Sequence, residues 1–170
     1  DVLTDKQRFQ IETIVDRLAK KEPIQYIWGE TTFCGLSFHV SRDVLIPRPE
    51  TEQLIRLIVN DFSSCPSPRI LDIGTGSGCI AISLASLLPA SRVTALDISS
   101  SALQVAADNA TLNHVSVSWT CVDILSSEAE SCLEQYDCIV SNPPYIMEHE
   151  QLEMDASVLD YEPHKALFVP

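Results

Sequence analysis

The chain has 170 residues, 45% of them hydrophobic, which is enough for one globular domain with a real core and a small appendage. No apolar run approaches the roughly 18 residues that a membrane span needs, and the first apolar pattern is amphipathic, unlike a secretory signal. The net charge of −13 argues against tight binding to a phosphate backbone, so a nucleic-acid partner is disfavoured and a basic protein partner fits better. The six cysteines form no C-x-x-C pair and have no His at ligand spacing, so we expect reduced thiols, a cytoplasmic location and no metal site.

A helix is predicted near the start of the chain. Thr4 and Gln7 have the spacing of a capping box, and Pro23 ends the helical pattern. One face carries apolar side chains at helical spacing, namely Ile11, Ile14, Val15 and Leu18. A helix this short is not stable alone, so we interpret residues 1–22 as the end of a helical N-terminal domain or as a linker helix packed on the next segment of the chain.

Residues 23–66 are predicted to form a β-hairpin, a proline-rich loop and a helix. Apolar and polar residues alternate from 31 to 40 around Cys34-Gly35, which predicts a hairpin with a glycine in its turn. The loop Pro47-Arg48-Pro49 then leads into a helical pattern set by Leu54, Ile55 and Ile58. Two interpretations of this loop fit the local sequence: the start of a proline-initiated helix, or a lid over a ligand.

Residues 67–170 carry the pattern strand, glycine loop, helix, strand, helix, strand, which is typical of an α/β fold. The predicted strands cover residues 69–73, 92–96, 115–121 and 137–141. The predicted helices cover residues 79–88, 101–113 and 128–134. We therefore predict a doubly wound, Rossmann-like sheet in which the carboxyl ends of successive strands meet at one edge.

A glycine loop, Asp-Ile-Gly-Thr-Gly-Ser-Gly at residues 72–78, joins the first of these strands to its helix. Glycines let a backbone approach a ligand closely, and the start of the following helix offers free N–H groups. Gly76-x-Gly78-x-x-Ala81 also satisfies the dinucleotide fingerprint, with Asp97 about 20 residues further on. An NAD(P)-binding domain therefore remains an alternative at this point.

Two acids follow the next two strands. Asp97 ends the second strand, where a carboxylate can accept hydrogen bonds from both hydroxyls of a ribose, although an N-cap or turn role fits as well. Asp123 follows the third strand, where it is positioned to contact an adenine amino group or to be a solvated loop acid. Because both lie at the ligand-binding edge of the predicted sheet, their joint occurrence favours a nucleoside-containing ligand.

The stretch Asn142-Pro143-Pro144-Tyr145 follows an apolar strand directly. Each proline biases the residue before it to extended backbone, and each removes one N–H donor. The stretch is therefore a stiff turn that presents carbonyl oxygens, an amide and an aromatic ring beyond the end of the strand. A rigid loop that only caps the strand is the alternative interpretation.

The combination of these features resembles the HemK/PrmC family of S-adenosylmethionine-dependent protein-(glutamine-N5) methyltransferases. The resemblance rests on the glycine loop with its two acids, on residues 46–52 (Ile-Pro-Arg-Pro-Glu-Thr-Glu), on residues 141–146 (Ser-Asn-Pro-Pro-Tyr-Ile) and on Tyr161-Glu162-Pro163. It covers about residues 22–170 and implies a class I methyltransferase sheet behind the short helix and the hairpin. In that family a helical domain precedes the hairpin and further strands follow, so we expect this chain to be a fragment.

The resemblance also implies the ligands and their residues. The cofactor is expected to be S-adenosylmethionine, and the partner a class 1 peptide chain release factor, methylated on the glutamine of its Gly-Gly-Gln motif. The residues expected to bind the cofactor are Asp72, Gly74, Thr75, Gly76, Ser77, Gly78, Asp97, Asp123, Ile124 and Asn142. The residues expected to bind the substrate and carry catalysis are Asn142, Pro143, Pro144 and Tyr145. Asp72 is expected to orient either the loop or the ammonium group of the cofactor.

Two other functions share part of this pattern. A nucleic-acid amino methyltransferase also uses an Asn-Pro-Pro-aromatic turn, but the net charge of −13 and the Pro-Arg-Pro-Glu stretch argue against it. An NAD(P)-dependent oxidoreductase shares the glycine loop, yet it has no use for the turn at Asn142.

Overall fold

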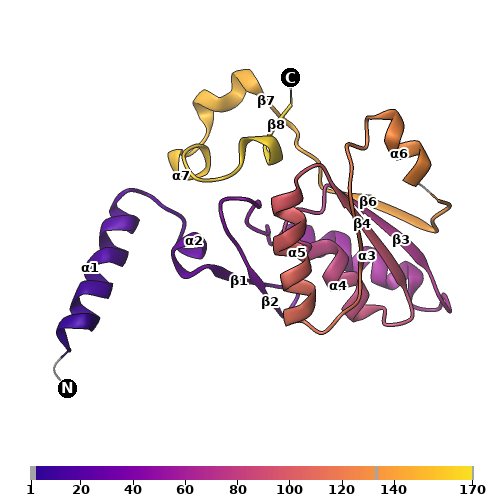
Figure 1. Cartoon of the computed structure of the whole chain (residues 1–170), viewed down its shortest axis with the longest axis horizontal. Coiled ribbons are helices and arrows are strands. Elements are labelled where there is room, and N and C mark those ends of the chain that lie inside the picture. The colour runs from indigo at the N-terminus through magenta and orange to yellow at the C-terminus, as the bar shows by residue number, and fades with distance from the viewer. Residues whose placement is uncertain (1–2, 133, 170) are drawn as a thin grey trace.

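The computed structural model describes residues 3–132 and 134–169. Residues 1, 2, 133 and 170, which belong to the predicted segments 1–22, 128–134 and 67–170, lie outside the described residues. Figure 1 shows a central sheet with helices packed against it, a helix α1 that extends away at one end, and a C-terminal segment beyond the strand ends.

The central sheet consists of four parallel strands, β3 (Arg69–Ile73), β4 (Arg92–Asp97), β5 (Ser118–Cys121) and β6 (Cys138–Ser141). Their order β5-β4-β3-β6 places the first strand in the middle, as in one half of a doubly wound sheet. Ile73 is in register with Leu96 on one side and Ser141 on the other, so three strands end at the same level. The predicted α/β fold with a parallel sheet is confirmed.

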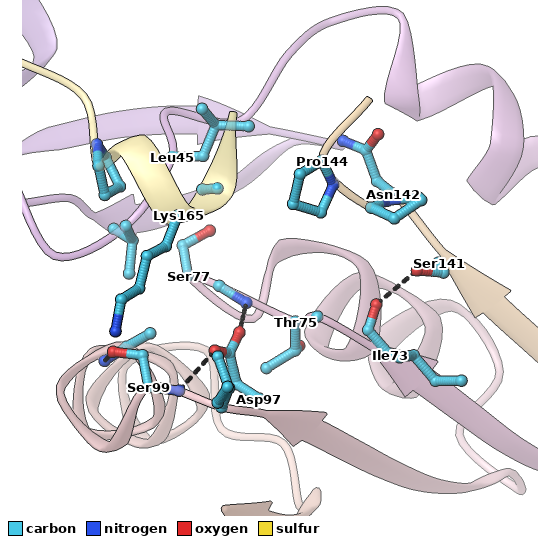
Figure 2. A pocket seen from close by; sticks show the side chains of 18 of the residues that line it. Leu45, Ile73, Thr75, Ser77, Asp97, Ser99, Ser141, Asn142, Pro144 and Lys165 are labelled. Atoms are coloured by element: carbon cyan, nitrogen blue, oxygen red, sulfur yellow. Dashed lines mark hydrogen bonds between the residues drawn. The ribbon is translucent and has the colours of Figure 1, made fainter. Parts of the chain in front are cut away.

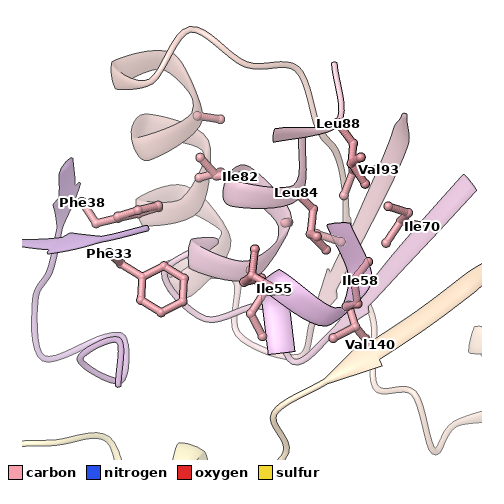
Figure 3. Packing of buried hydrophobic residues seen from close by; sticks show 14 residues of the cluster. Phe33, Phe38, Ile55, Ile58, Ile70, Ile82, Leu84, Leu88, Val93 and Val140 are labelled. Atoms are coloured by element: carbon pink, nitrogen blue, oxygen red, sulfur yellow. The ribbon is translucent and has the colours of Figure 1, made fainter. Parts of the chain in front are cut away.

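Successive side chains of β3 point to opposite faces and so belong to two cores. On one face, Ile70 packs with buried residues of α3 (Thr51–Phe62) and α4 (Cys79–Leu87), as Figure 3 shows. Ala110 of α5 (Ser100–Leu112) completes this cluster. On the other face, Leu71 packs with Leu96, Val122 and Ala129, the last of these from α6 (Ser127–Cys132). Helices on both faces bury the sheet and leave its carboxyl edge open for a site.

Helix α1 (Asp5–Ala19) forms as predicted, with the capping box between Thr4 and Gln7. Its apolar face, however, does not pack on the segment after it, because no residue of α1 is buried and Val15 is 55% exposed. Only the last turn reaches the body of the protein, where Arg17 pairs with Glu22 just before α2 (Ile24–Trp28). The interpretation of residues 1–22 as the end of a helical N-terminal domain or as a linker helix stays a prediction.

The predicted β-hairpin is present as β1 (Glu30–Phe33) and β2 (Leu36–His39). Its two turn residues, Cys34 and Gly35, both have positive φ, at 49° and 77°, as the right-handed twist of a two-residue hairpin requires. Phe33 and Phe38 are buried and meet edge to face, with ring centroids 6.2 Å apart (Figure 3). The hairpin thus covers the end of the main core.

The third core strand is shorter than predicted. It begins at Ser118, opposite Thr94 of β4, whereas the apolar pattern predicted a strand from residue 115. The reason is that the chain turns just after α5 at His114, which has φ 57°, and the Val115 N–H donates back to the carbonyl oxygen of Ala110 at 3.1 Å. That N–H closes the helix and is not available to the sheet.

The C-terminal segment folds over the strand ends. It contains β7 (Ile146–Met147), η1 (Glu148–Glu153), α7 (Ala156–Leu159), η2 (His164–Ala166) and β8 (Phe168–Val169). Strands β7 and β8 pair with each other in parallel. In residues 3–132 and 134–169, no helix has the length and hydropathy needed to cross a bilayer.

Candidate functional site

A cavity of about 460 Å³ lies at the carboxyl ends of β3, β4 and β6, which is a size typical of small-molecule sites. Most of the predicted site residues line it: Gly74, Thr75, Gly76, Ser77, Asp97, Asp123, Ile124, Asn142, Pro143 and Pro144. The predicted residues Asp72, Gly78 and Tyr145 are not among its lining residues. Figure 2 shows Asn142 and Pro144 on one side of this space and Ser77 and Asp97 below it.

The glycine loop is held by hydrogen bonds to β4. The N–H groups of Gly74 and Thr75 both donate to the carbonyl oxygen of Leu96, at 2.9 and 3.0 Å. Gly76 has φ 56°, and no protein atom lies within 4 Å of the place where a Cβ would stand. Since Gly76 also lines the cavity, that open space belongs to the site. The loop therefore presents bare backbone to a ligand.

Asp97 organises the strand end on which it lies. One carboxylate oxygen accepts the N–H of Gly76 at 2.8 Å, and the other accepts the N–H of Ser99 at 2.9 Å (Figure 2). Ser99 in turn caps α5, because its hydroxyl oxygen accepts the N–H of Ala102. Each carboxylate oxygen has a second lone pair, so Asp97 can shape the loop and still accept hydrogen bonds from a ligand in the cavity.

Asp72 lies beneath the loop and is fully buried. Its Oδ2 accepts the hydroxyl of Thr75 at 2.6 Å and the N–H of Ala81 at 3.2 Å, while Oδ1 has no partner among the described residues. Burial outweighs these hydrogen bonds and raises the pKa of Asp72 from 3.8 to about 7. Of the two roles expected for Asp72, this geometry favours orientation of the loop over direct contact with a ligand.

Asp123 is exposed and forms a turn after β5. Its carboxylate accepts the N–H of Leu125 at 2.9 Å, and its carbonyl oxygen accepts the hydroxyl of Ser126 at 2.7 Å. This turn places Ile124 and Leu125 on the cavity wall, and the Leu125 side chain is 91% exposed. Leu125 was not identified from the sequence, because an exposed apolar residue in a turn carries no periodic signal.

The turn after β6 is tied to the first strand by Ser141. The Ser141 hydroxyl donates to the carbonyl oxygen of Ile73 at 2.7 Å, immediately before the glycine loop (Figure 2). Asn142 follows on the cavity wall, and its side-chain amide has no hydrogen bond within residues 3–132 and 134–169. An amide without a partner at a cavity is free to bind one.

Tyr145 differs from expectation. It was expected to bind the substrate, but its side chain is 76% exposed and does not line the cavity. Strand β7 begins at Ile146, directly after Tyr145. In this conformation Pro144 is the residue of the pair that borders the cavity.

The wall opposite the glycine loop consists of two segments, residues 42–48 and 163–166. Arg48 and Glu162 form an ion pair between them. The helix that follows the Pro-Arg-Pro loop does begin at Thr51, and Pro47 and Arg48 do line the cavity. The loop therefore leads into a helix, as one interpretation predicts, and the lid role stays a prediction.

Asn109 contacts the glycine loop from α5 and was not identified from the sequence. This residue is fully buried in α5, between the predicted apolar positions Ala106 and Ala110. Its Nδ2 donates to the carbonyl oxygens of Ser77 and His39, at 2.9 and 3.0 Å. The sequence feature that could have identified it is a polar residue on an apolar helix face.

Among the described residues, no group of three His, Cys, Asp or Glu is arranged to hold a metal ion.

The chain is similar to known methyltransferases in both sequence and fold. Residues 50–160 match the family model described as methyltransferase small domain. Release factor glutamine methyltransferases of Flavobacterium psychrophilum and Bacteroides thetaiotaomicron are 49% and 52% identical over 98% and 97% of this chain. The chain spans 59% and 58% of the length of these relatives. The S-adenosylmethionine-dependent methyltransferase of Agrobacterium tumefaciens shares the fold, with a TM-score of 0.56 and 21% identity over 68% of this chain and 39% of its own.

Proposed function

The chain belongs to the methyltransferase small domain family, and we propose that it binds S-adenosylmethionine and methylates a glutamine of peptide chain release factors. The methyl group would go to the side-chain nitrogen of the glutamine in the Gly-Gly-Gln motif of class 1 factors. The observation that carries the proposal is that one cavity joins the glycine loop and Asp97 to the free amide of Asn142. The names of the two bacterial relatives support the choice of substrate.

The residues of the cavity fit this cofactor. The open backbone at Gly76 suits the amino-acid portion, and the free lone pairs of Asp97 suit the two ribose hydroxyls. Ile124 and Leu125 offer apolar surface to the adenine, and Asp123 stands beside them. When bound, the cofactor supplies an electrophilic methyl group on a cationic sulfur, for which an acidic strand edge is electrostatically favourable.

The turn at Asn142 accounts for the substrate side of the reaction. An amide nitrogen is a poor nucleophile, because its lone pair is delocalised into the carbonyl group. Its two N–H groups need two acceptors, and we assign these roles to the Asn142 side-chain oxygen and the Pro143 carbonyl oxygen. Both hydrogen bonds strengthen as positive charge develops on the nitrogen. Pro144 covers the flat amide and keeps water away.

No titrating base is required by this scheme. An N-methylated amide cation is strongly acidic and loses its proton readily to water. Holding the nitrogen in line with the methyl group can itself supply roughly 7–11 kcal/mol of barrier reduction. His164 lines the cavity, but its Nε2 lies 3.0 Å from the Leu159 carbonyl oxygen and its ring packs edge-on against Phe168. We assign it no role in proton transfer.

The proposal is tested by methyl labelling. The whole protein is incubated with labelled S-adenosylmethionine and a class 1 release factor, beside a factor whose motif glutamine is replaced by alanine. Asn142→Ala should lower kcat about 10²–10³-fold, the loss typical of one such acceptor or donor. Asn60→Ala, an exposed asparagine on α3, is the matched control and should behave as wild type.

Four results would contradict the proposal. Equal labelling by wild type and Asn142→Ala would show that Asn142 has no role in the reaction. Labelling of the glutamine-free factor would show that the motif glutamine is not the methylated residue. Labelling of DNA or RNA alone favours a nucleic-acid methyltransferase. Calorimetry that detects tight binding of NAD and none of S-adenosylmethionine favours an oxidoreductase domain.

We also propose a cytoplasmic location. Five cysteines of the described residues, namely Cys34, Cys65, Cys79, Cys121 and Cys138, are free thiols, as is usual in a reducing compartment. Fractionation of cells that produce the protein at natural levels would test this location.

A further inference from the structure

The carboxylate of Glu162 joins two distant segments of the chain. Its side chain is 1% exposed, and Oε1 accepts a 2.5 Å hydrogen bond from Arg48 Nη2. Its Oε2 accepts the backbone N–H of Ile46 at 3.2 Å. One buried carboxylate thus binds both the side chain and the backbone of the Pro-Arg-Pro loop, 114 and 116 residues away in sequence.

The two segments that Glu162 joins form the roof of the cavity, which we define as residues 44–48 and 163–166. Figure 2 shows Leu45 above Ser77, and Lys165 beside Ser77 with its side chain extending toward Ser99. The first segment is also fixed at both ends. The Val44 carbonyl oxygen accepts the buried hydroxyl of Tyr26 at 2.7 Å, and the Arg48 carbonyl oxygen accepts the N–H of Thr51 at the start of α3.

The second roof segment continues into the turn that carries Asn142. Strand β8 follows the roof and pairs with β7, with Ile146 in register with Phe168. The Ile146 N–H donates to the carbonyl oxygen of Leu167 at 3.1 Å. Because Ile146 directly follows Tyr145, this two-residue ladder connects the roof to the Asn142 turn.

A buried ion pair of this kind is weak evidence for stability, because removing two charges from water offsets most of their attraction. It does, however, fix geometry, since a buried carboxylate tolerates few arrangements of its partners. We propose that Arg48 and Glu162 are positioning residues for methyl transfer, which hold the roof and thereby set the place of the Asn142 turn over the cofactor. This inference rests on the proposed function.

The test uses the whole protein with Arg48→Ala, Arg48→Lys, Glu162→Gln and the double variant Arg48→Ala/Glu162→Gln. Arg56→Ala is the matched control, because Arg56 also pairs with a glutamate, Glu52 at 3.1 Å, but lies exposed on α3 away from the cavity. Thermal unfolding, S-adenosylmethionine binding, kcat at saturating cofactor and release factor, and hydrogen–deuterium exchange are measured for each.

Arg48→Ala should lower kcat at least tenfold and raise exchange in both residues 142–147 and 161–169, while Arg56→Ala leaves both unchanged. The kcat of the double variant should lie within about twofold of the kcat of the worse single variant, because the two residues act as one unit. Arg48→Lys, which keeps the charge but not the planar fork, should stay folded and recover part of the kcat.

A kcat of folded Arg48→Ala within twofold of wild type overturns the inference, as do losses that multiply in the double variant. If Arg48→Ala does not fold, Arg48→Lys decides: raised exchange at residues 161–169 with a wild-type kcat overturns it. Failure of the proposed function is recognised separately, because wild type then methylates no release factor, while the exchange data still report whether the roof and the turn are coupled.

Discussion

The side-chain amide of Asn109 donates a 2.9 Å hydrogen bond to the carbonyl oxygen of Ser77, so helix α5 holds the glycine loop on the side away from the cavity. The same amide group donates to the His39 carbonyl oxygen, and the Asn109 Oδ1 accepts the His39 N–H at 2.7 Å. One asparagine therefore links the hairpin to the loop. The hairpin is a support of the site rather than an independent appendage.

Replacing Asn109 by alanine should destabilise the protein by at least about 2 kcal/mol. The change leaves the Ser77 carbonyl oxygen without a partner in a buried position and the backbone N–H and C=O of His39 without partners in a partly buried one, and a buried group of this kind costs about 1–3 kcal/mol. Asn113→Ala is the control: Asn113 bonds the same hairpin at Ser37, but from a half-exposed position, so water can replace it. Urea unfolding of both variants measures the difference, and equal losses would contradict the linking role of Asn109.

Ser141→Ala should lower kcat strongly while lowering the stability of the fold only slightly. Loss of one hydroxyl-to-carbonyl bond costs about 1 kcal/mol, or about 2–4 °C in Tm for a protein of this size. The turn after β6 is then no longer tied to Ile73, and a displacement of about 1 Å can lower kcat by up to about a hundredfold. Ser63→Ala removes a similar bond to Asn60 in an exposed turn and should leave kcat unchanged. If both variants keep wild-type kcat, the tie does not position the site.

The parts of the site that the sequence predicts are those with a local signal. The glycine loop, Asp97 and Asn142 each follow a strand whose apolar run is visible, and parallel strands bring their carboxyl ends to one edge. The hairpin turn is likewise local, because Cys34-Gly35 sits between alternating residues.

The parts that sequence reasoning misses depend on partners far away in the chain. Asn109 meets His39 at a separation of 70 residues, and Glu162 meets Arg48 at 114. The hydrophobic periodicity of a sequence indicates local helices and strands, and it gives no information on pairs so far apart. The pairing of β7 with β8, which follows Tyr145 in the chain, likewise joins residues about 20 positions apart.

Two alanine substitutions in the glycine loop should differ in their main effect: one lowers stability most, and the other lowers cofactor binding most. A Cβ on Gly78 would stand 2.8, 3.1 and 3.3 Å from atoms of Ile82, Ala106 and Trp119 respectively. Gly78→Ala should therefore destabilise the fold by more than the roughly 1–2 kcal/mol that positive φ alone costs. A Cβ on Gly76 would meet no protein atom, so Gly76→Ala should lower the free energy of unfolding only by the cost of its positive φ. It should nevertheless weaken S-adenosylmethionine binding at least tenfold.

Calorimetry and urea unfolding of the two glycine variants separate these effects. The cradle role of Gly76 is contradicted if Gly76→Ala binds the cofactor as wild type does. Gly74→Ala extends the comparison, because Gly74 has φ 71° and is likewise free of protein contacts at the Cβ position.

Asp72 should make stability depend on pH. Its pKa rises from 3.8 to about 7 in the folded protein, mainly because burial disfavours the charged carboxylate. Between these values the folded state holds a proton that the unfolded state has lost, so this contribution falls as pH rises from about 4 to 7 and is constant above. A pKa difference of about three corresponds to up to about 4 kcal/mol. The asparagine variant Asp72→Asn is neutral at every pH and can still accept from Thr75 and Ala81.

The stability of Asp72→Asn relative to wild type should therefore increase as pH rises from 5 to 8, and urea unfolding at unit intervals measures it. Repeating both series at about 1 M salt is the control, because salt screens exposed pairs and leaves a buried carboxylate almost unaffected. Parallel curves for the two proteins would show that Asp72 is charged in the folded state. The carboxylate would then need a cation at Oδ1, the oxygen that has no partner in the described residues. S-adenosylmethionine carries an ammonium group of that charge, so tighter cofactor binding by wild type than by Asp72→Asn would assign Asp72 a direct contact with the cofactor.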